Sequence, residues 1–352
     1  MKASSLRIAI NAHYLYRSRL SGLARYAREI INALPSETFV EIRPPKFFYR
    51  KNSKAWRYLR FGVLAVYECL LPPVLLVLRR AELHISPAFA VPLCWWSSRC
   101  VVVVHDLAFR EFSSGYSRPE QLYLWFNLRL LRAGKYRIVT PSAYVKQSVC
   151  DFLRISDTRV TVISPYSDLP KPRGAVLMDI PEKYFLLLSN AHPRKNIDAT
   201  VAGFHASSAP MAGYKLLVAG NFERRVNISS PHVLVRPGVS DEELASLFVG
   251  AEALLLFSLS EGFGFPVVEA AQFDIVSLTS EVSSLRELIS PHRTPQPALT
   301  AVEITAAIDK YLADATFRTK LKGDAAYVKS MFTKDKFDRQ WQELVLGDQH
   351  FL

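Results

Sequence analysis

Short apolar runs alternate with segments of helical periodicity along almost the whole chain. In the first half, this alternation predicts strands over 6–12, 38–43, 83–86, 101–105, 137–140 and 160–164, and helices over 22–34, 56–70, 119–133 and 142–153. Such an order is typical of a parallel sheet with crossover helices. The four valines from Val101 to Val104 are typical of a central strand that is buried on both faces.

The same alternation resumes after a proline-rich segment. Residues 164–174 contain Pro165, Pro170 and Pro172, and this composition predicts an interdomain linker. Beyond it, the pattern predicts strands over 184–189, 215–219, 232–235, 253–258 and 275–279, and helices over 196–206, 241–249, 266–272, 302–313 and 316–330. Two successive α/β series are therefore expected.

This organisation predicts an α/β fold of two Rossmann-like domains. The 352 residues are an ordinary length for two domains. We expect an N-terminal domain over 1–168 and a C-terminal domain over 169–334. A last helix over 335–346 carries Phe337, Trp341 and Leu344 on one face, and we expect residues 335–352 to cross back to the N-terminal domain. Two such domains imply a central ligand crevice at the carboxyl ends of their strands.

Residues 61–78 form an apolar stretch that approaches the length of a membrane span. Glu68 lies in its middle, and Pro72 and Pro73 interrupt it. We therefore predict a buried amphipathic helix that stops at the prolines, with a membrane span as the weaker alternative. The N-terminus begins with a strand-like run and lacks the pattern of a secretory signal, so we expect a cytoplasmic protein.

The whole excess behind the net charge of +12 comes from the first half of the chain. Residues 1–170 hold 25 Lys and Arg against 11 Asp and Glu, whereas residues 171–352 hold 19 against 21. Between Arg43 and Arg60 there are seven cations, no acid, and several interleaved aromatic residues. We interpret this segment as a contact with an anionic membrane surface, which would place the protein peripherally on the inner face of the cytoplasmic membrane. A solvated basic loop and a nucleic-acid contact are the alternatives.

The metal-binding residue types form no recognisable site in the sequence. The four cysteines include no CxxC pair, and the eight histidines include no HExxH or HxH group. We therefore predict no metal and no cofactor. Cys94 and Cys100 are close enough in sequence to pair, but free thiols in a reducing cytosol are the favoured interpretation.

The most specific pattern is Ser260-Glu-Gly-Phe-Gly-Phe-Pro-Val-Val-Glu269, which follows the apolar strand 253–258. It predicts a strand, a glycine turn and a helix that has Pro266 at its first position. The open N–H groups and the positive dipole end of that helix would form an anion site. Glu261 before the turn and Glu269 in the first helical turn would offer acceptors to sugar hydroxyls. An ordinary strand–turn–helix connection would also fit these residues.

Two glutamates separated by seven residues around Gly-Phe-Gly-Phe-Pro resemble the signature of retaining glycosyltransferases of family 4, which have the GT-B fold. In that family the first glutamate contacts hydroxyls of the donor sugar and the second binds the ribose of the nucleotide. The resemblance implies these roles for Glu261 and Glu269. It also implies donor binding by the turn between them, whose members are Gly262, Phe263, Gly264 and Phe265.

Residues 184–196 resemble the strand and Pro-Arg-Lys-Asn turn that open the second domain of the same family. The resemblance implies that Lys195 neutralises the donor diphosphate, with Arg194 as a second cation. The family commonly has an arginine five residues before this lysine, where this chain has Asn190. That cation is either missing or replaced by Arg194, and Asn190 stays among the expected donor-binding residues. A basic turn capped by Asn196 is the alternative.

Two motifs of the first half also resemble this family. The segment from Ser21 to Ile30 is similar to the glycine loop and first helix that face the donor phosphates, which implies donor binding by Gly22. The run Val-Val-Val-Val-His-Asp-Leu over 101–107 resembles a strand whose histidine reaches the transferred sugar from the acceptor side. His105 and Asp106 take that place here, although a histidine that ends a strand can also be purely structural.

The resemblance implies a retaining, metal-independent hexosyltransferase whose catalytic residues are Glu261, His105 and Lys195. The N-terminal domain would bind the acceptor and the C-terminal domain the nucleotide-sugar donor. The motif forms are closest to members that use GDP-mannose or deoxysugar nucleotides in surface-polysaccharide assembly. Mannose from GDP-mannose is therefore the first candidate for the donor, and a glycan or a lipid-linked molecule for the acceptor. The alternatives are another GT-B enzyme, such as a nucleotide-sugar epimerase or phosphorylase, and a basic nucleic-acid-binding protein.

Overall fold

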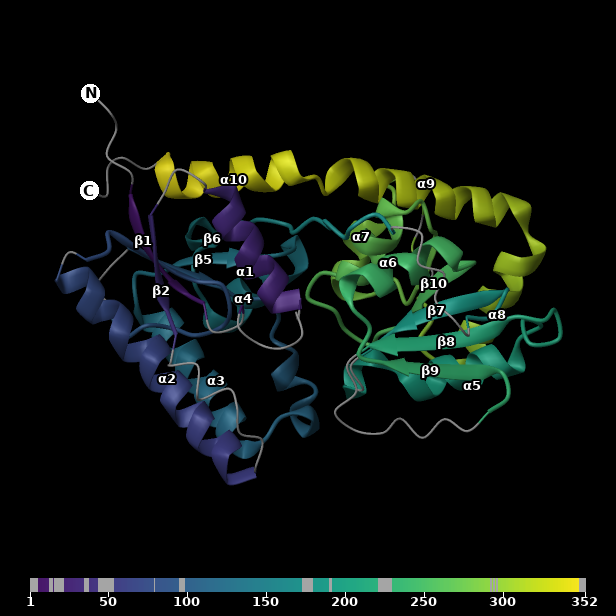
Figure 1. Cartoon of the computed structure of the whole chain (residues 1–352), viewed down its shortest axis with the longest axis horizontal. Coiled ribbons are helices and arrows are strands. Elements are labelled where there is room, and N and C mark those ends of the chain that lie inside the picture. Colours follow the sequence, from purple (N-terminus) through teal and green to yellow (C-terminus); the bar gives the residue numbers. More distant parts are fainter. Residues whose placement is uncertain are drawn as a thin grey trace. The chain divides into compact units, whose positions relative to one another are not determined.

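The computed structural model describes residues 6–12, 15, 22–34, 38–43, 54–78, 80–94, 99–172, 180–189, 192–220, 230–291, 293, 295 and 297–347. The chain forms two compact units (Figure 1). Unit 1 comprises Met1–Leu107, Tyr116–Ser164 and Asp335–Leu352, and unit 2 comprises Ala108–Gly115 and Pro165–Lys334. Each unit contains one parallel sheet with helices, so the predicted α/β class is confirmed.

In unit 1 the described strands form one sheet in the order β2-β1-β3-β4-β5-β6, and all neighbours are parallel. The strands are β1 (Arg7–Asn11), β2 (Thr38–Ile42), β3 (Leu83–Ser86), β4 (Cys100–Val103), β5 (Arg137–Thr140) and β6 (Val160–Val162). The helices are α1 (Gly22–Ala33), α2 (Lys54–Val77), α3 (Arg118–Ala133), α4 (Ala143–Leu153) and α10 (Lys334–Leu346). Every residue of β3 and β4 is buried, as expected of central parallel strands covered on both faces.

Helix α10 packs on α1 through aromatic side chains. The ring of Tyr26 lies edge-on to those of Phe337 and Trp341, with centroids 5.6 and 6.4 Å apart. The buried residues of α10 are Phe337, Trp341 and Val345, and Leu344 is half-buried. Positions 337, 341, 344 and 345 all fall on one side of a helix, so the predicted face is present and Val345 extends it.

Helix α2 continues to Val77, so the predicted stop at the prolines is wrong. Pro72 and Pro73 lie inside the helix. A proline cannot donate to the carbonyl four residues before it, which deprives the Cys69 carbonyl of its helical donor. The backbone N–H of Leu93 donates to this carbonyl instead, at 2.7 Å. A tertiary hydrogen bond thus replaces a helical one. Among the helices in the described part of the chain, none is long and apolar enough to cross a membrane.

Unit 2 is built around a second sheet, in the order β11-β10-β7-β8-β9, again with parallel neighbours. Its strands are β7 (Tyr184–Leu188), β8 (Lys215–Gly220), β9 (Val233–Pro237), β10 (Ala253–Leu256) and β11 (Ser277–Thr279). Its helices are α5 (Ile197–Ala206), α6 (Asp241–Gly250), α7 (Phe265–Gln272), α8 (Ala301–Ala313) and α9 (Ala315–Met331). The segment directly after Ser164 is bonded to unit 2 through Gln272 of α7. The Gln272 side chain accepts from Ser167 Oγ at 2.6 Å and donates to the Leu169 carbonyl at 2.9 Å.

The strand order of unit 2 reverses at β7. From β7 the chain moves outward to β8 and β9, and then returns to place β10 and β11 on the other side of β7. Such a reversal opens a crevice at the carboxyl ends of the two central strands, because the loops that follow them run in opposite directions. The two motifs of the C-terminal half, in residues 189–196 and 257–264, are the loops that follow β7 and β10.

Candidate active site

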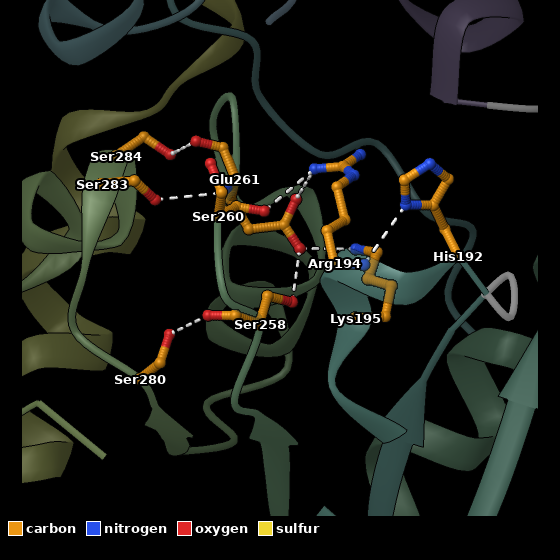
Figure 2. Close-up of polar contacts among 9 residues, drawn as sticks. All are labelled: His192, Arg194, Lys195, Ser258, Ser260, Glu261, Ser280, Ser283 and Ser284. Atoms are coloured by element: carbon orange, nitrogen blue, oxygen red, sulfur yellow. Dashed lines mark hydrogen bonds and ion pairs between the residues drawn. The ribbon is translucent and has the colours of Figure 1, made fainter. Parts of the chain in front are cut away.

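Glu261 lies where three loops of unit 2 meet. The loop after β7 carries Arg194 and Lys195 in the 3-10 turn η6 (Pro193–Lys195). This loop is joined to the loop after β10 by a hydrogen bond from the Leu259 N–H to the Arg194 carbonyl, at 2.7 Å. The third loop follows β11 and includes the 3-10 turn η7 (Ser283–Leu288). Side chains from all three loops point toward Glu261 (Figure 2).

Three side chains hold the Glu261 carboxylate. Its Oε1 accepts from Lys195 Nζ at 2.5 Å and from Ser258 Oγ at 2.7 Å, and its Oε2 accepts from Arg194 Nη1 at 2.8 Å. Arg194 Nη1 also donates to the Ser260 carbonyl at 3.1 Å. The cluster thus unites two cations with one carboxylate and keeps an excess of positive charge.

Serines of the β11 loop hold the backbone of Glu261. Its N–H donates to Ser283 Oγ at 2.9 Å, and its carbonyl accepts from Ser284 Oγ at 2.8 Å. Ser280 Oγ donates to the Ser258 carbonyl at 2.5 Å. Sequence reasoning missed these four serines. Ser258 ends a predicted strand and could have been noticed there, but nothing in the local sequence of the other three points to Glu261.

The charge state of Glu261 follows from its surroundings. Burial by itself would raise the pKa of this carboxyl, but the charges of Lys195 and Arg194 and the hydrogen bonds from Lys195 and Ser258 outweigh burial and lower the pKa to about 2. The side chains of Arg194 and Lys195 are 17% and 11% exposed, against 6% for Glu261. The two cations are thus more open to an anion than the carboxylate with which they pair.

Asn196 shapes the turn that carries the two cations. Its backbone is left-handed, with φ of 51°, and its side chain makes no cap hydrogen bond to α5. The side-chain amide donates to the carbonyls of Phe257 and Leu299, at 3.1 and 2.8 Å. Asn196 caps the basic turn, as the sequence alternative had it, because it ends η6 in a left-handed conformation. Its side chain in addition ties the cationic turn to the end of β10.

Gly264 sits at the start of α7 in a conformation that favours glycine. Its φ is +109°, and a Cβ at this position would lie 2.7 Å from Leu285 and 2.8 Å from Leu288. Phe265 and Pro266 are the first two helical residues. The predicted glycine turn is confirmed, whereas Pro266 takes the second helical position and not the first, because the helix begins one residue earlier than predicted. The Phe263 ring packs edge-on against Phe265. Gly262, which directly follows Glu261, is buried.

Glu269 is buried in α7, with 4% of its surface exposed. The first turn of this helix contains no acidic residue, so the predicted place of Glu269 in the first turn is wrong. The helix begins at Phe265, which puts Glu269 one residue beyond the first turn. Glu261 and Glu269 both belong to unit 2. Glu261 precedes the glycine turn at 262–264 in the sequence, and Glu269 follows it. Asn190, the remaining predicted donor residue of this half, lies outside the described residues.

Unit 1 holds the other predicted site residues. Gly22 is the first residue of α1 and is exposed. His105 follows β4, and its Nε2 lies 2.7 Å from the Pro87 carbonyl, so Nε2 carries the proton and Nδ1 is the acceptor nitrogen. Its ring meets Tyr26 edge-on at 5.0 Å, and burial lowers the pKa of His105. Asp106, the next residue, is half-buried.

Among the described residues there is no group of three or more His, Cys, Asp and Glu side chains that could hold a metal ion. The described cysteines Cys69, Cys94, Cys100 and Cys150 are free thiols. The expectation of a metal-independent protein stays a prediction, and chelation tests it below.

A second buried ion cluster supports the β11 loop. Arg293 Nη1 lies 2.6 Å from Glu281 Oε1, and Arg293 Nε lies 2.6 Å from Asp324 Oδ2 on α9. Glu281 and Ser283 both have left-handed backbones, with φ of 55° and 51°. Such conformations persist where surrounding contacts hold them. Arg293 holds this loop at Glu281, and the contacts with Glu261 hold it at Ser283 and Ser284.

Replacing Arg293 with methionine is expected to destabilise unit 2 by about 3–5 kcal/mol, because Glu281 and Asp324 would stay buried without this cation. Urea unfolding monitored by fluorescence measures the change. The deficit should shrink as the pH falls, since burial raises the pKa of Asp324 and a proton can then neutralise it. The exposed Arg339→Met is the control. An equally small effect of both variants would contradict a supporting role for Arg293.

Residues 174–326 match the family described as glycosyl transferases, group 1. The second unit is a group 1 glycosyltransferase domain. The resemblance that rested on the motifs around Lys195 and Glu261 is thereby confirmed, and both motifs lie within the matched residues of this glycosyltransferase domain.

Two curated relatives show distant similarity. The serotype-specific mannosyltransferase WbdA of Escherichia coli is 26% identical over 272 residues, which are 70% of this chain and 32% of WbdA. The O-antigen chain mannosyltransferase RfbU of Salmonella typhimurium is 25% identical over 198 residues, 54% of each protein. The chain thus spans about a third of the length of the first relative and about half of the second.

Solved structures confirm the fold of the whole chain. The structure of HepE from Anabaena, determined in complex with UDP and glucose, matches with a TM-score of 0.70 at 13% identity. The match covers 97% of this chain and 100% of HepE. At this identity the likeness concerns the fold, and the predicted GT-B class is confirmed.

Proposed function

We propose that this chain is a retaining glycosyltransferase that moves a sugar from a nucleotide-sugar donor to a glycan or lipid-linked acceptor in surface-polysaccharide assembly. The observation that carries the proposal is the Arg194–Lys195–Glu261 cluster at the strand reversal of a group 1 glycosyltransferase domain. Ligands of open α/β sheets bind at such reversals. Two partly exposed cations there suit a diphosphate, and the carboxylate with which they pair keeps them in place.

In the proposed reaction, the bond between the sugar C1 and the donor diphosphate breaks, and a bond forms between C1 and an acceptor oxygen on the same face. Lys195 and Arg194 stabilise the negative charge that develops on the departing diphosphate. The departing phosphate oxygen takes the proton of the acceptor hydroxyl, so no separate base is required. Glu261 orients the donor sugar through its hydroxyls, and Glu269 binds the ribose.

Unit 1 would contribute through Gly22 near the phosphates and through His105 and Asp106 on the acceptor side. Because Nε2 of His105 is committed to the Pro87 carbonyl, Nδ1 is the nitrogen available to accept a hydrogen bond from a sugar hydroxyl. Burial disfavours the imidazolium form. A neutral histidine that orients a hydroxyl fits this environment better than a cationic one.

Mannose from GDP-mannose is the first candidate for the donor. The names of WbdA and RfbU, both mannosyltransferases, support it, whereas the UDP bound to HepE makes a UDP-sugar the main competitor. A thermal-shift panel of GDP, UDP, ADP, dTDP and their sugars tests the proposal. Stabilisation by one nucleotide and more by one of its sugars is the expected result. No shift with any of them would contradict a nucleotide-sugar enzyme.

Sugar transfer is expected to continue in excess EDTA. The Arg194 and Lys195 charges sit where other enzymes use a divalent ion to neutralise the diphosphate, so removal of free metal should change kcat by less than about twofold. Product formation with and without EDTA measures this. Loss of transfer that Mg²⁺ or Mn²⁺ restores would show that the two cations are insufficient.

A further inference from the structure

An exposed apolar surface covers α2 and α3 of unit 1. Large hydrophobic side chains are exposed there at eight positions, by between 43% and 71%. On α2 they are Val66, Leu70, Val74 and Val77, with Leu78 directly after its end, and on α3 they are Leu122, Trp125 and Phe126. Eight large apolar side chains exposed on two neighbouring helices exceed the scattered exposure of an ordinary surface, and such groups mark sites where something binds. We call these eight residues the α2–α3 surface.

The exposed apolar residues of α2 lie on a different face of the helix from the residues that pack into the core. Tyr67, Leu71 and Leu75 pack toward the sheet, against a cluster that contains Ala9 and Ile42. The residues of the α2–α3 surface recur at positions 66, 70, 74 and 77–78, the spacing of one helix face, over about 18 Å of helix. Helix α2 is therefore apolar on two sides, and folding of the described chain covers only one of them.

Helices α2 and α3 lie side by side on one face of the sheet (Figure 1). The connections from β2 to β3 through α2 and from β4 to β5 through α3 cross the sheet in the same direction, and right-handed crossovers then place both helices on one face. Tyr123 of α3 donates to Glu68 of α2 at 3.3 Å. The exposed residues of both helices consequently point away from the same sheet.

Charge on α3 distinguishes the partner. Arg118, Arg129 and Arg132 are exposed and share a helix face with Leu122 and Trp125, at the spacing 118, 122, 125, 129 and 132. The exposed acid of this helix, Glu120, closes the capping box with Ser117. Arginines that alternate with leucine and tryptophan on one helix face are typical of helices that lie in a lipid headgroup layer.

We propose that the α2–α3 surface docks on an anionic lipid bilayer, with its apolar side chains between headgroups and its arginines on lipid phosphates. A lipid surface fits better than a protein partner because residues 1–170 hold 25 Lys and Arg against 11 Asp and Glu, and such an excess of positive charge beside exposed apolar side chains favours an anionic bilayer. The basic segment between Arg43 and Arg60 leads directly into α2 in the sequence and would add to the attraction. Residues 44–53 and the side chains of 54–61 lie outside the described part, so the surface proposed here rests on α2 and α3 alone.

The test is co-sedimentation of the full chain with vesicles of phosphatidylcholine, with or without phosphatidylglycerol, at low ionic strength. Binding only to the anionic vesicles, and release by salt, is expected. Leu122→Gln with Phe126→Gln should weaken binding by about tenfold or more, since two inserted side chains become polar. The matched control is Met211→Gln with Val302→Gln, which changes two residues of unit 2 that are 95% and 79% exposed and should bind like the wild type.

Three results would overturn the proposal. The first is a wild type that ignores anionic vesicles. The second is wild-type binding by the Leu122→Gln and Phe126→Gln variant, above all if neutralising Lys46, Arg50, Lys51 and Lys54 abolishes binding. The third is a self-associating wild type that becomes monomeric in the Leu122→Gln and Phe126→Gln variant, which would assign the surface to a second copy of this chain. Nucleotide binding in the thermal-shift panel is a separate readout, so failure here leaves the proposed glycosyl transfer standing.

Discussion

Replacing Lys195 with methionine is expected to lower kcat by about 10²- to 10³-fold, the cost of losing one preorganised donor from a developing charge. Lys195 Nζ lies in the cluster with Glu261 and Arg194, and it is partly open to solvent. Steady-state kinetics at saturating acceptor measure the change. Lys320→Met, on the exposed side of α9, is the matched control and should keep wild-type kcat. An unchanged kcat for the Lys195 variant would remove this lysine from the diphosphate site.

The same variant should acquire a new pH dependence. In the wild type the pKa of Glu261 is about 2, so this carboxylate stays ionised throughout the neutral and mildly acidic range. Without Lys195 the burial of Glu261 is opposed mainly by Arg194, and its pKa must rise. Protonation on lowering the pH then removes the charge that holds Arg194. Activity of the variant should therefore fall further at mildly acidic pH, whereas the wild type shows no such step from Glu261.

A double variant separates diphosphate binding from simple neutralisation of Glu261. If Lys195 only balances the buried carboxylate, Glu261→Gln should restore both stability and nucleotide affinity to the Lys195→Met protein, since the pair is directly coupled. If Lys195 binds the diphosphate, stability should recover while nucleotide affinity stays low. Thermal unfolding and calorimetric titration of the same samples distinguish the two outcomes.

Replacing Glu269 with alanine is expected to weaken nucleotide-sugar binding strongly while the fold survives. Two ribose hydroxyls would lose a charged acceptor, at about 1.5–3 kcal/mol for each hydrogen bond, or a loss of roughly 10²- to 10⁴-fold in affinity. Glu269 is 4% exposed on α7, so circular dichroism must first show that the variant is folded. Calorimetric titration then measures the affinity.

Discrimination between nucleotides gives this prediction a sharper readout. The wild type should prefer a ribonucleotide to its deoxyribose analogue, and Glu269→Ala should lose that preference. Glu242→Ala on α6 changes an exposed carboxylate of the same unit and should keep it. Unchanged donor affinity in the Glu269 variant would remove this residue from the site, and lost affinity with the ribose preference intact would point to a structural effect on α7.

Local patterning was sufficient to predict the secondary structure closely. Predicted strands such as 83–86 and 137–140 coincide with β3 and β5, and the predicted helix over 302–313 differs from α8 by one residue. Hydrophobic periodicity and turn residues act within a few positions of each other, so they can be read without knowledge of the fold. The same holds for the turn at Gly264 and Pro266, where backbone conformation and missing N–H groups are properties of single residues.

Long-range contacts decided what the sequence could not. Helix α2 continues through Pro72 and Pro73 to Val77, and the N–H of Leu93, distant in sequence, supplies the donor that the Cys69 carbonyl lacks within the helix. The strand order that brings Lys195 beside Glu261 joins residues 66 positions apart, although the family resemblance pointed to both.

The clamp of Glu261 by Ser283 and Ser284 has no local signature, because a serine that accepts or donates one hydrogen bond 22 or 23 residues away looks like any other serine in a loop. Composition, periodicity and turn chemistry thus determined the helices and strands of this protein and pointed to the loops that carry Lys195 and Glu261. Only the packing of the parallel sheet determined which side chains meet there, since the partners of a buried charge are chosen by proximity in space and not along the chain.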